Sequence, residues 1–188
     1  CSRDRSPLQP AGTSPAAGLV GQLVAERYQV ERLIGEGGMG EVYLATHVLM
    51  ERRCALKVMS PALSKDADAV RRFNREATNA SRISHPNVCT IYDFGLTAGG
   101  LVYLAMEYVD GKTLTAVLEQ SGPMPVRRAA DLVAQCAAGL TAAHQLGIVH
   151  RDLKPDNIMV AAGKDREIVK LVDFGIAKAI EGEPGQRV

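Results

Sequence analysis

Three glycines, Gly35, Gly37 and Gly40, form a G-x-G-x-x-G motif that could hold phosphate groups. Because glycine has no side chain, the backbone N–H groups of such a turn can approach phosphate oxygens closely. A dinucleotide-binding turn would need a helix directly after the glycines, whereas a strand-like sequence follows here. A flap over a nucleoside triphosphate is therefore favoured over a dinucleotide site, and a plain structural hairpin remains the alternative.

Lys57 and Glu76 are candidates for an ion pair. Lys57 lies between apolar neighbours in a predicted strand, so its stem is partly buried and its ammonium group needs a partner. Glu76 lies on or beside the apolar stripe of a predicted helix and could supply that partner. The ordinary alternatives are a lysine whose charged end reaches solvent and a surface pair of Glu76 with Arg72, which contributes only about 0.3–0.5 kcal/mol.

Short strands and one helix must position these residues. Five runs of residues are predicted to be strands, namely 28–38, 40–48, 52–59, 88–95 and 101–109. Apolar residues spaced three and four apart predict an amphipathic helix over 66–84. This stripe consists of Val70, Phe73, Ala77, Ala80 and Ile83. The first half of the chain is therefore rich in strands and carries both the glycine motif and Lys57.

The second half is predicted to be helical. A short helix is expected around 113–120 and a long one over 125–145, opened by Pro125 and closed by Gly147. The change from a strand-rich to a helix-rich sequence near 108–111 predicts a hinge between two lobes. No internal repeat is found.

Composition excludes several classes of protein. The 188 residues are 46% hydrophobic and 23% charged, which suffices for a buried core. A formal net charge of +1 gives no electrostatic basis for nucleic-acid binding. No apolar run approaches the roughly 20 residues that span a bilayer. The four cysteines form no C-x-x-C pair, which argues against a zinc site and fits a reducing compartment.

Two further strings settle the interpretation of the glycine motif. HRDLKPDN occupies 150–157, and Asp173-Phe174-Gly175 follows Asn157 by sixteen residues. Together with the glycine loop, the strand lysine and the helix glutamate, they occur in the order typical of eukaryotic-type protein kinases, and the chain resembles that family. The GEGGMGEVY loop, the HPNV turn and the EYVDGKTL joint are more similar to bacterial serine/threonine kinases than to animal ones.

The resemblance implies an α+β fold with two lobes: a small N-terminal lobe with a five-stranded antiparallel sheet and one helix, and a truncated helical C-terminal lobe. Residues 1–22 are rich in Ser, Pro, Ala and Gly, and this composition predicts a flexible leader. By the resemblance, 28–109 form the N-terminal lobe and hinge, and 110–188 the first part of the C-terminal lobe, cut within the activation segment.

The resemblance also implies the chemistry, which is transfer of the γ-phosphoryl group of ATP with Mg²⁺ as cofactor. Asp152 would accept the proton of the substrate hydroxyl, and Lys154 would neutralise the transferred phosphoryl group. Asn157 and Asp173 would hold two Mg²⁺ ions. The lysine in HRDLK is typical of the enzymes that act on serine and threonine, so proteins with Ser/Thr acceptors are the expected substrates.

Lys57, held by Glu76, would contact the α- and β-phosphates of ATP. Adenine would lie in an apolar slot and bond to the hinge backbone near Glu107 and Val109, with Met106 guarding the back of the slot. The complete set of expected nucleotide-binding residues is Ile34, Gly35, Glu36, Gly37, Gly38, Met39, Gly40, Val42, Ala55, Lys57, Glu76, Met106, Glu107, Val109 and Met159.

Two neighbouring features receive other roles. Arg151 could dock a phosphorylated residue of the activation segment, although 175–188 contain no Ser, Thr or Tyr. A second D-F-G string at Asp93 precedes the hinge and is assigned to a strand end and turn without a catalytic role. His150, Phe174 and Ala80 are expected to be packing residues.

The chain starts with Cys1 and stops shortly after the D-F-G string, so we expect a fragment of a longer protein. A complete domain of this family has about 250–280 residues, and the fragment alone is expected to be inactive. A cytoplasmic location is expected, and the resemblance allows a membrane anchor beyond the C-terminal end and a dimer of kinase domains. A pseudokinase acting as a nucleotide-gated scaffold, and a small-molecule or lipid kinase, are the alternatives.

Overall fold

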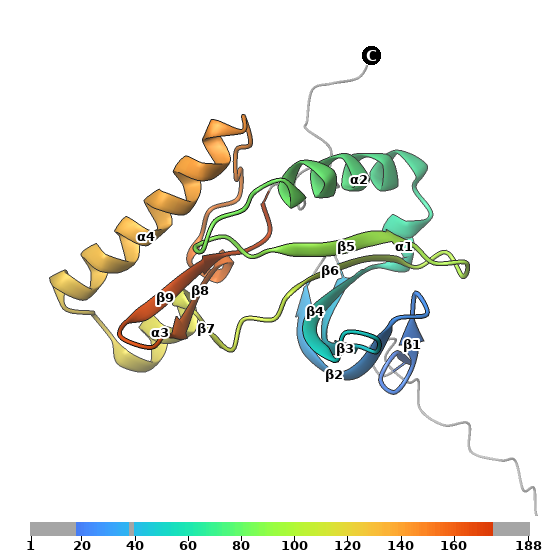
Figure 1. Cartoon of the computed structure of the whole chain (residues 1–188), viewed down its shortest axis with the longest axis horizontal. Coiled ribbons are helices and arrows are strands. Elements are labelled where there is room, and N and C mark those ends of the chain that lie inside the picture. Colours follow the sequence, from blue (N-terminus) through green and yellow to red (C-terminus); the bar gives the residue numbers. More distant parts are fainter. Residues whose placement is uncertain (1–17, 38–39, 175–188) are drawn as a thin grey trace, which may run out of the picture.

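The computed structural model describes residues 18–37 and 40–174, which form two lobes (Figure 1). The first lobe contains a six-stranded antiparallel sheet with the order β1-β2-β3-β4-β6-β5. Its elements are β1 (Leu23–Val24), β2 (Tyr28–Gly37), β3 (Gly40–His47), β4 (Arg52–Met59), α1 (Pro61–Ser64), α2 (Ala67–Ser81), β5 (Ile91–Leu96) and β6 (Val102–Glu107).

The second lobe combines helices with a small sheet. Its elements are β7 (Gly111–Thr113), α3 (Leu114–Ser121), α4 (Val126–Gln145), the 3₁₀ helix η2 (Pro155–Asn157), β8 (Ile158–Ala162) and β9 (Glu167–Leu171). Both predicted helices of this half are confirmed with ends shifted by about a residue, whereas the sheet β7-β8-β9 was not predicted. None of the helices in the described ranges is both long and apolar enough to cross a bilayer.

The number of strands in the first lobe differs from the prediction of five, because β1 adds a sixth. This strand has only two residues and pairs with the start of β2, so it carries no periodic pattern that sequence reasoning could detect. The residues just before it are also bonded to β2: Gly21 N donates to Val30 O and Val30 N donates to Gln22 O, both at 2.9 Å. Residues 1–17 of the predicted leader lie outside the described residues.

The glycine motif forms the turn of a hairpin in which β3 follows β2 directly, as predicted. Gly37 pairs with Gly40, while Gly38 and Met39 lie outside the described residues. Gly40 has a φ of +143°, and a Cβ atom there would lie 2.0 Å from Val58 O on β4. Only glycine fits this position, because a side chain would collide with the backbone of the adjacent strand.

Helix α2 covers one face of the first sheet, alongside β5 (Figure 1). Asp66 caps its start by accepting hydrogen bonds from the backbone N–H groups of Asp68 and Ala69. Phe73 and Ala77, from the predicted stripe, are buried in one core cluster with Leu104 of β6. The apolar stripe therefore fixes which face of α2 meets the sheet, and it brings Glu76 to the buried side.

Strand β9 joins the two lobes. Leu171 N donates to Asn87 O and Cys89 N donates to Leu171 O, both at 2.9 Å, so the segment after α2 pairs with β9. The amide of Gln135, on α4, completes this strand: its Oε1 accepts from Val169 N at 3.0 Å and its Nε2 donates to Glu167 O at 3.1 Å. The HPNV turn of the sequence is therefore anchored to the second lobe.

The second D-F-G string lies within β5 rather than at a strand end and turn. Oδ2 of Asp93 accepts from the hydroxyls of Tyr28 at 3.1 Å and Tyr103 at 2.9 Å, and it pairs with Arg27 at 3.1 Å. Burial, followed by the contact with Asp93, raises the pKa of Tyr103 to about 12. Asp93 thus ties β2, β5 and β6 together.

The amide of Gln135 should be required for stability. It is 8% exposed and also accepts from Asn87 Nδ2 at 3.0 Å. Gln135→Ala removes these bonds and leaves the buried Val169 N without its acceptor, so the free energy of unfolding should fall by about 1–3 kcal/mol. Gln145→Ala, at the exposed end of α4, should stay within about 0.5 kcal/mol of the wild type. Urea unfolding measures both, and equal midpoints would contradict the assignment.

Candidate active site

A cleft of about 760 Å³ opens between the two lobes, within the range that holds small-molecule ligands. Strands β2, β3 and β4 form one wall, the connection after β6 forms the back, and β8 with the loop before it forms the other wall. The expected site residues that line it are Ile34, Gly35, Glu36, Gly37, Gly40, Val42, Ala55, Lys57, Met106, Glu107, Val109, Asp152, Lys154, Asn157, Met159 and Asp173.

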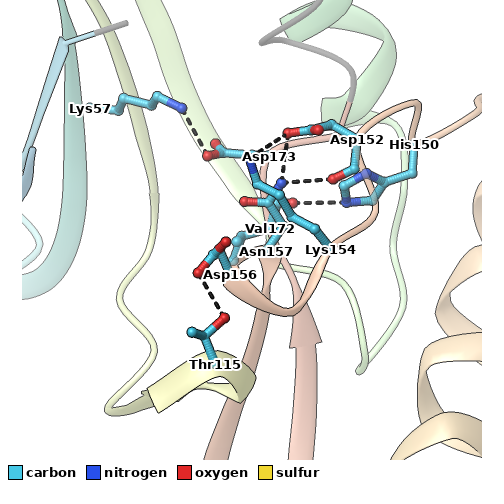
Figure 2. A network of polar contacts seen from close by, with 9 residues as sticks. All are labelled: Lys57, Thr115, His150, Asp152, Lys154, Asp156, Asn157, Val172 and Asp173. Atoms are coloured by element: carbon cyan, nitrogen blue, oxygen red, sulfur yellow. Dashed lines mark hydrogen bonds and ion pairs between the residues drawn. The ribbon is translucent and has the colours of Figure 1, made fainter. Parts of the chain in front are cut away.

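Lys57 reaches this cleft from β4, where it stands opposite Val42 on β3. The residue is only 6% exposed, so its ammonium group must find a partner inside the protein. Its Nζ donates to Oδ2 of Asp173 at 2.9 Å (Figure 2). This ion pair joins the first lobe to the end of the second sheet across the cleft.

Glu76 lies elsewhere, and the predicted pair with Lys57 is wrong: within the described residues no ion pair joins the two. The carboxylate of Glu76 accepts instead from the guanidinium of Arg75, with Nη2–Oε1 at 3.2 Å. Nη1 of Arg151 lies 3.9 Å from the same oxygen. The position of α2 turns Glu76 toward the loop that carries Arg151, so Asp173 takes the place beside Lys57.

The loop over 150–157 folds back on itself and gathers three polar side chains (Figure 2). Asn157 Nδ2 donates to the backbone oxygen of Asp152 at 2.8 Å and to its Oδ2 at 3.0 Å. Lys154 Nζ lies 3.3 Å from the same Oδ2. The turn is closed by a bond from Asn157 N to Lys154 O at 2.9 Å. Asp152 is therefore oriented by an amide and stands next to a cation.

His150 supports this loop from inside the protein. Its Nε2 lies 3.0 Å from Val172 O (Figure 2). Its ring packs against that of Phe174 at a tilt of 49°, with the centroids 4.5 Å apart. Burial lowers the pKa of the imidazole below its usual 6.5, against a smaller opposing effect of the Val172 carbonyl. His150 and Phe174 are thus in contact, as expected of packing residues, and they connect the loop to Asp173.

The residues around Asp173 fit a hard cation. Oδ1 of Asp173 is buried and has no hydrogen-bond partner, while Oδ2 is bonded to Lys57. The amide nitrogen of Asn157 makes both of its side-chain hydrogen bonds, which leaves its carbonyl oxygen for a cation. Oxygen ligands of this kind suit Mg²⁺, which takes few protein ligands and completes its shell with water and phosphate oxygens. The described residues contain no group of three or more His, Cys, Asp or Glu side chains arranged for a metal.

Several cleft residues were not predicted, because no role was assigned to them from the sequence. They are Arg32, Cys89, Tyr108, Gly111, Lys112, Thr113, Ala116, Gln120, Asp156 and Val172. Asp156 accepts from Thr115 Oγ1 at 2.7 Å, which ties the loop to α3 (Figure 2). Burial raises the pKa of Cys89 to about 12, so its thiol stays protonated at the back of the cleft. Asp156 lies within HRDLKPDN and Tyr108 within EYVDGKTL, so membership of these strings was the available signal for both.

A family model for the protein kinase domain matches residues 28–187. The chain belongs to the protein kinase family. It is similar to the serine/threonine-protein kinase pkn3 of Myxococcus xanthus, with 44% identity over 160 residues, which cover 85% of this chain and 29% of the relative. PknB of Mycobacterium leprae is also 44% identical, over 84% of this chain and 25% of the relative. The chain spans less than a third of the length of these curated kinases.

Solved kinase structures confirm the fold class. The kinase domain of Mycobacterium tuberculosis PknI is 39% identical and superposes with a TM-score of 0.74, covering 84% of this chain and 63% of that one. The two-lobed α+β architecture implied by the sequence motifs is therefore that of a protein kinase, with the extra strand β1 and the sheet β7-β8-β9 as additions to the prediction.

The buried His150 should make the stability of the kinase lobe depend on pH. Below pH 6.5 the unfolded chain binds a proton at His150 that the folded chain resists, so the free energy of unfolding should fall as the pH drops through this region. His150→Gln removes this contribution and should flatten the dependence between about pH 7 and pH 5, as measured by urea unfolding. His144→Gln, on the exposed surface of α4, serves as the control and should keep the wild-type slope. An unchanged slope in His150→Gln would refute the assignment.

Proposed function

We propose that the protein containing this chain transfers the γ-phosphoryl group of ATP to serine and threonine hydroxyls of other proteins. The observation that carries the proposal is the meeting of four polar side chains in one cleft beneath a glycine hairpin. These side chains are Lys57, Asp152, Asn157 and Asp173. The similarity of the chain to serine/threonine-protein kinases supports the same reaction.

Adenine is proposed to lie at the back of the cleft, where apolar side chains line both walls. Val42 and Ala55 come from the first lobe and Met159 from the second, and Met106 closes the rear. The backbone of the connection after β6 supplies hydrogen-bonding groups at the same depth. The glycines of the hairpin then lie over the phosphates, where they have no side chains to exclude them.

Lys57 is proposed to hold the α- and β-phosphates. Its ammonium group already lies 2.9 Å from Asp173, so phosphate oxygens would share a cation that is fixed at the inner end of the cleft. Asn157 and Asp173 would bind Mg²⁺ through their free oxygens, and the bound cation would neutralise charge on the phosphates.

Asp152 is proposed to orient the acceptor hydroxyl and take its proton. Its Oδ2 is held by Asn157 at 3.0 Å and lies 3.3 Å from Lys154 Nζ. A carboxylate fixed in this way can accept a hydrogen bond from a hydroxyl group in the cleft. Lys154 is then well placed to offset negative charge on the phosphoryl group as it moves between oxygens.

Because the chain spans 29% of pkn3 and 25% of PknB, the proposal concerns the whole protein. The 188 residues alone are proposed to lack transfer activity, since the solved PknI domain extends well beyond the matched region. We place the kinase domain in the cytoplasm, where ATP is available and where the free thiols of Cys54, Cys89 and Cys136 are stable.

Phosphoryl transfer should depend on both lobes of the cleft. In the full-length protein, Lys57→Met and Asp152→Asn should each lower kcat/KM for transfer of labelled phosphate from Mg-ATP by about 100-fold or more. The first variant removes the phosphate-binding cation and the second the proton acceptor. The matched controls are the exposed residues Lys65→Met and Asp165→Asn, which should keep wild-type activity.

Three outcomes separate the candidate functions. Full transfer by both cleft variants would refute the site assignment. Binding of Mg-ATP by the wild type without any transfer to protein would favour a nucleotide-gated scaffold. Transfer to a small molecule or lipid but not to protein would contradict the proposed substrate class.

A further inference from the structure

A second ion pair joins the lobes behind the cleft, and the proposed reaction gives it no role. Lys170 Nζ on β9 lies 2.8 Å from Oε2 of Glu107 at the end of β6. The two side chains are only 16% and 24% exposed, respectively. An ion pair that is partly shielded from solvent is less screened than a surface pair.

Glu107 lies where the two lobes are connected. Its backbone N donates to Thr90 O at 2.8 Å, and its Oε2 accepts from Thr90 N at 3.2 Å as well as from Lys170. Thr90 directly follows Cys89, whose N is bonded to Leu171 O on β9. One carboxylate therefore fastens the start of the hinge to the segment after α2 and to the second lobe.

Lys170 does not line the cleft itself. It stands opposite Met159 on β8, and Met159 and Glu107 both line the cleft. Lys170 therefore lies outside the cleft and contacts the hinge through Glu107, next to the place proposed for adenine. A change in the angle between the lobes would separate the tip of β6 from β9 and lengthen this bond.

We propose that Lys170 is a positioning residue that holds the hinge at the lobe angle required for nucleotide binding, acting through Glu107. This inference rests on the proposed function, since it assigns the hinge to ATP. Loss of the tether lets the lobes sample wider angles, so a smaller share of molecules is competent to bind nucleotide. Affinity for ATP should then fall, while the transfer step, which depends on Lys57 and Asp152, should change little once ATP is bound.

The test compares Lys170→Met, Lys170→Arg and the control Lys164→Met in the full-length protein. Lys164 lies in the exposed β8–β9 turn of the same hairpin. Lys170→Met should raise Kd and KM for Mg-ATP by about threefold to tenfold, with kcat within about twofold. Lys170→Arg keeps the charge and should restore most of the affinity, and Lys164→Met should match the wild type. Thermal melting checks that every variant is folded.

A double-mutant cycle with Glu107→Gln tests the route of action. Glu107→Gln keeps an oxygen for Thr90 N but loses the charge, so adding Lys170→Met should cost no further affinity. Wild-type affinity in Lys170→Met, or additive losses in the cycle, would overturn the inference while leaving the proposed function intact. Failure of the wild type to bind Mg-ATP would overturn both.

Discussion

Charged groups that are withdrawn from water need partners, and for Lys57 the partner comes from the opposite lobe. Lys57 on β4 is 6% exposed and bonds to Asp173, which follows β9. Neither group could be buried at this place by its own lobe without a large desolvation cost. The cleft is consequently the place where Lys57 from the first lobe and Asp173 from the second satisfy each other's charge. Any ligand that enters must exchange these contacts for its own, which favours a ligand rich in negative charge together with a cation.

Several elements of the structure hold strand β9 in place. Strand β9 pairs with β8, with the segment after α2, and with the amide of Gln135 on α4. Its last residue, Leu171, lies two positions before Asp173, so the path of the strand fixes where this carboxylate emerges. His150 holds the backbone of Val172 at 3.0 Å between them. Strand β9, helix α4 and the loop with His150 thus together fix the position of the segment that carries the Asp173 carboxylate.

The sequence predicted the parts of this molecule that depend on local pattern or on a motif. Alternation and helical spacing located the main strands and the helices, because burial of one face is encoded in neighbouring residues. Strand β1 escaped notice since two residues carry no period. The partner of Glu76 could not be predicted, because both Lys57 and Arg151 are cations within reach of a helix whose rotation depends on packing. Lys170 was missed because its partner, the carboxylate of Glu107, is distant in the sequence and no motif links the two residues.

The contacts along the outer side of β9 have a consequence for association between chains. A strand with unpaired N–H and C=O groups is a template for another strand, and natural sheets protect such borders. Here Asn87 Nδ2 bonds to Val169 O at 2.9 Å, Gln135 bonds to Val169 N at 3.0 Å and the backbone of Cys89 bonds to Leu171 O at 2.9 Å. These two amide side chains and one short backbone segment occupy positions that a foreign strand would otherwise fill. This edge of the second sheet is therefore already paired at Val169 and Leu171, which disfavours addition of a strand from another chain.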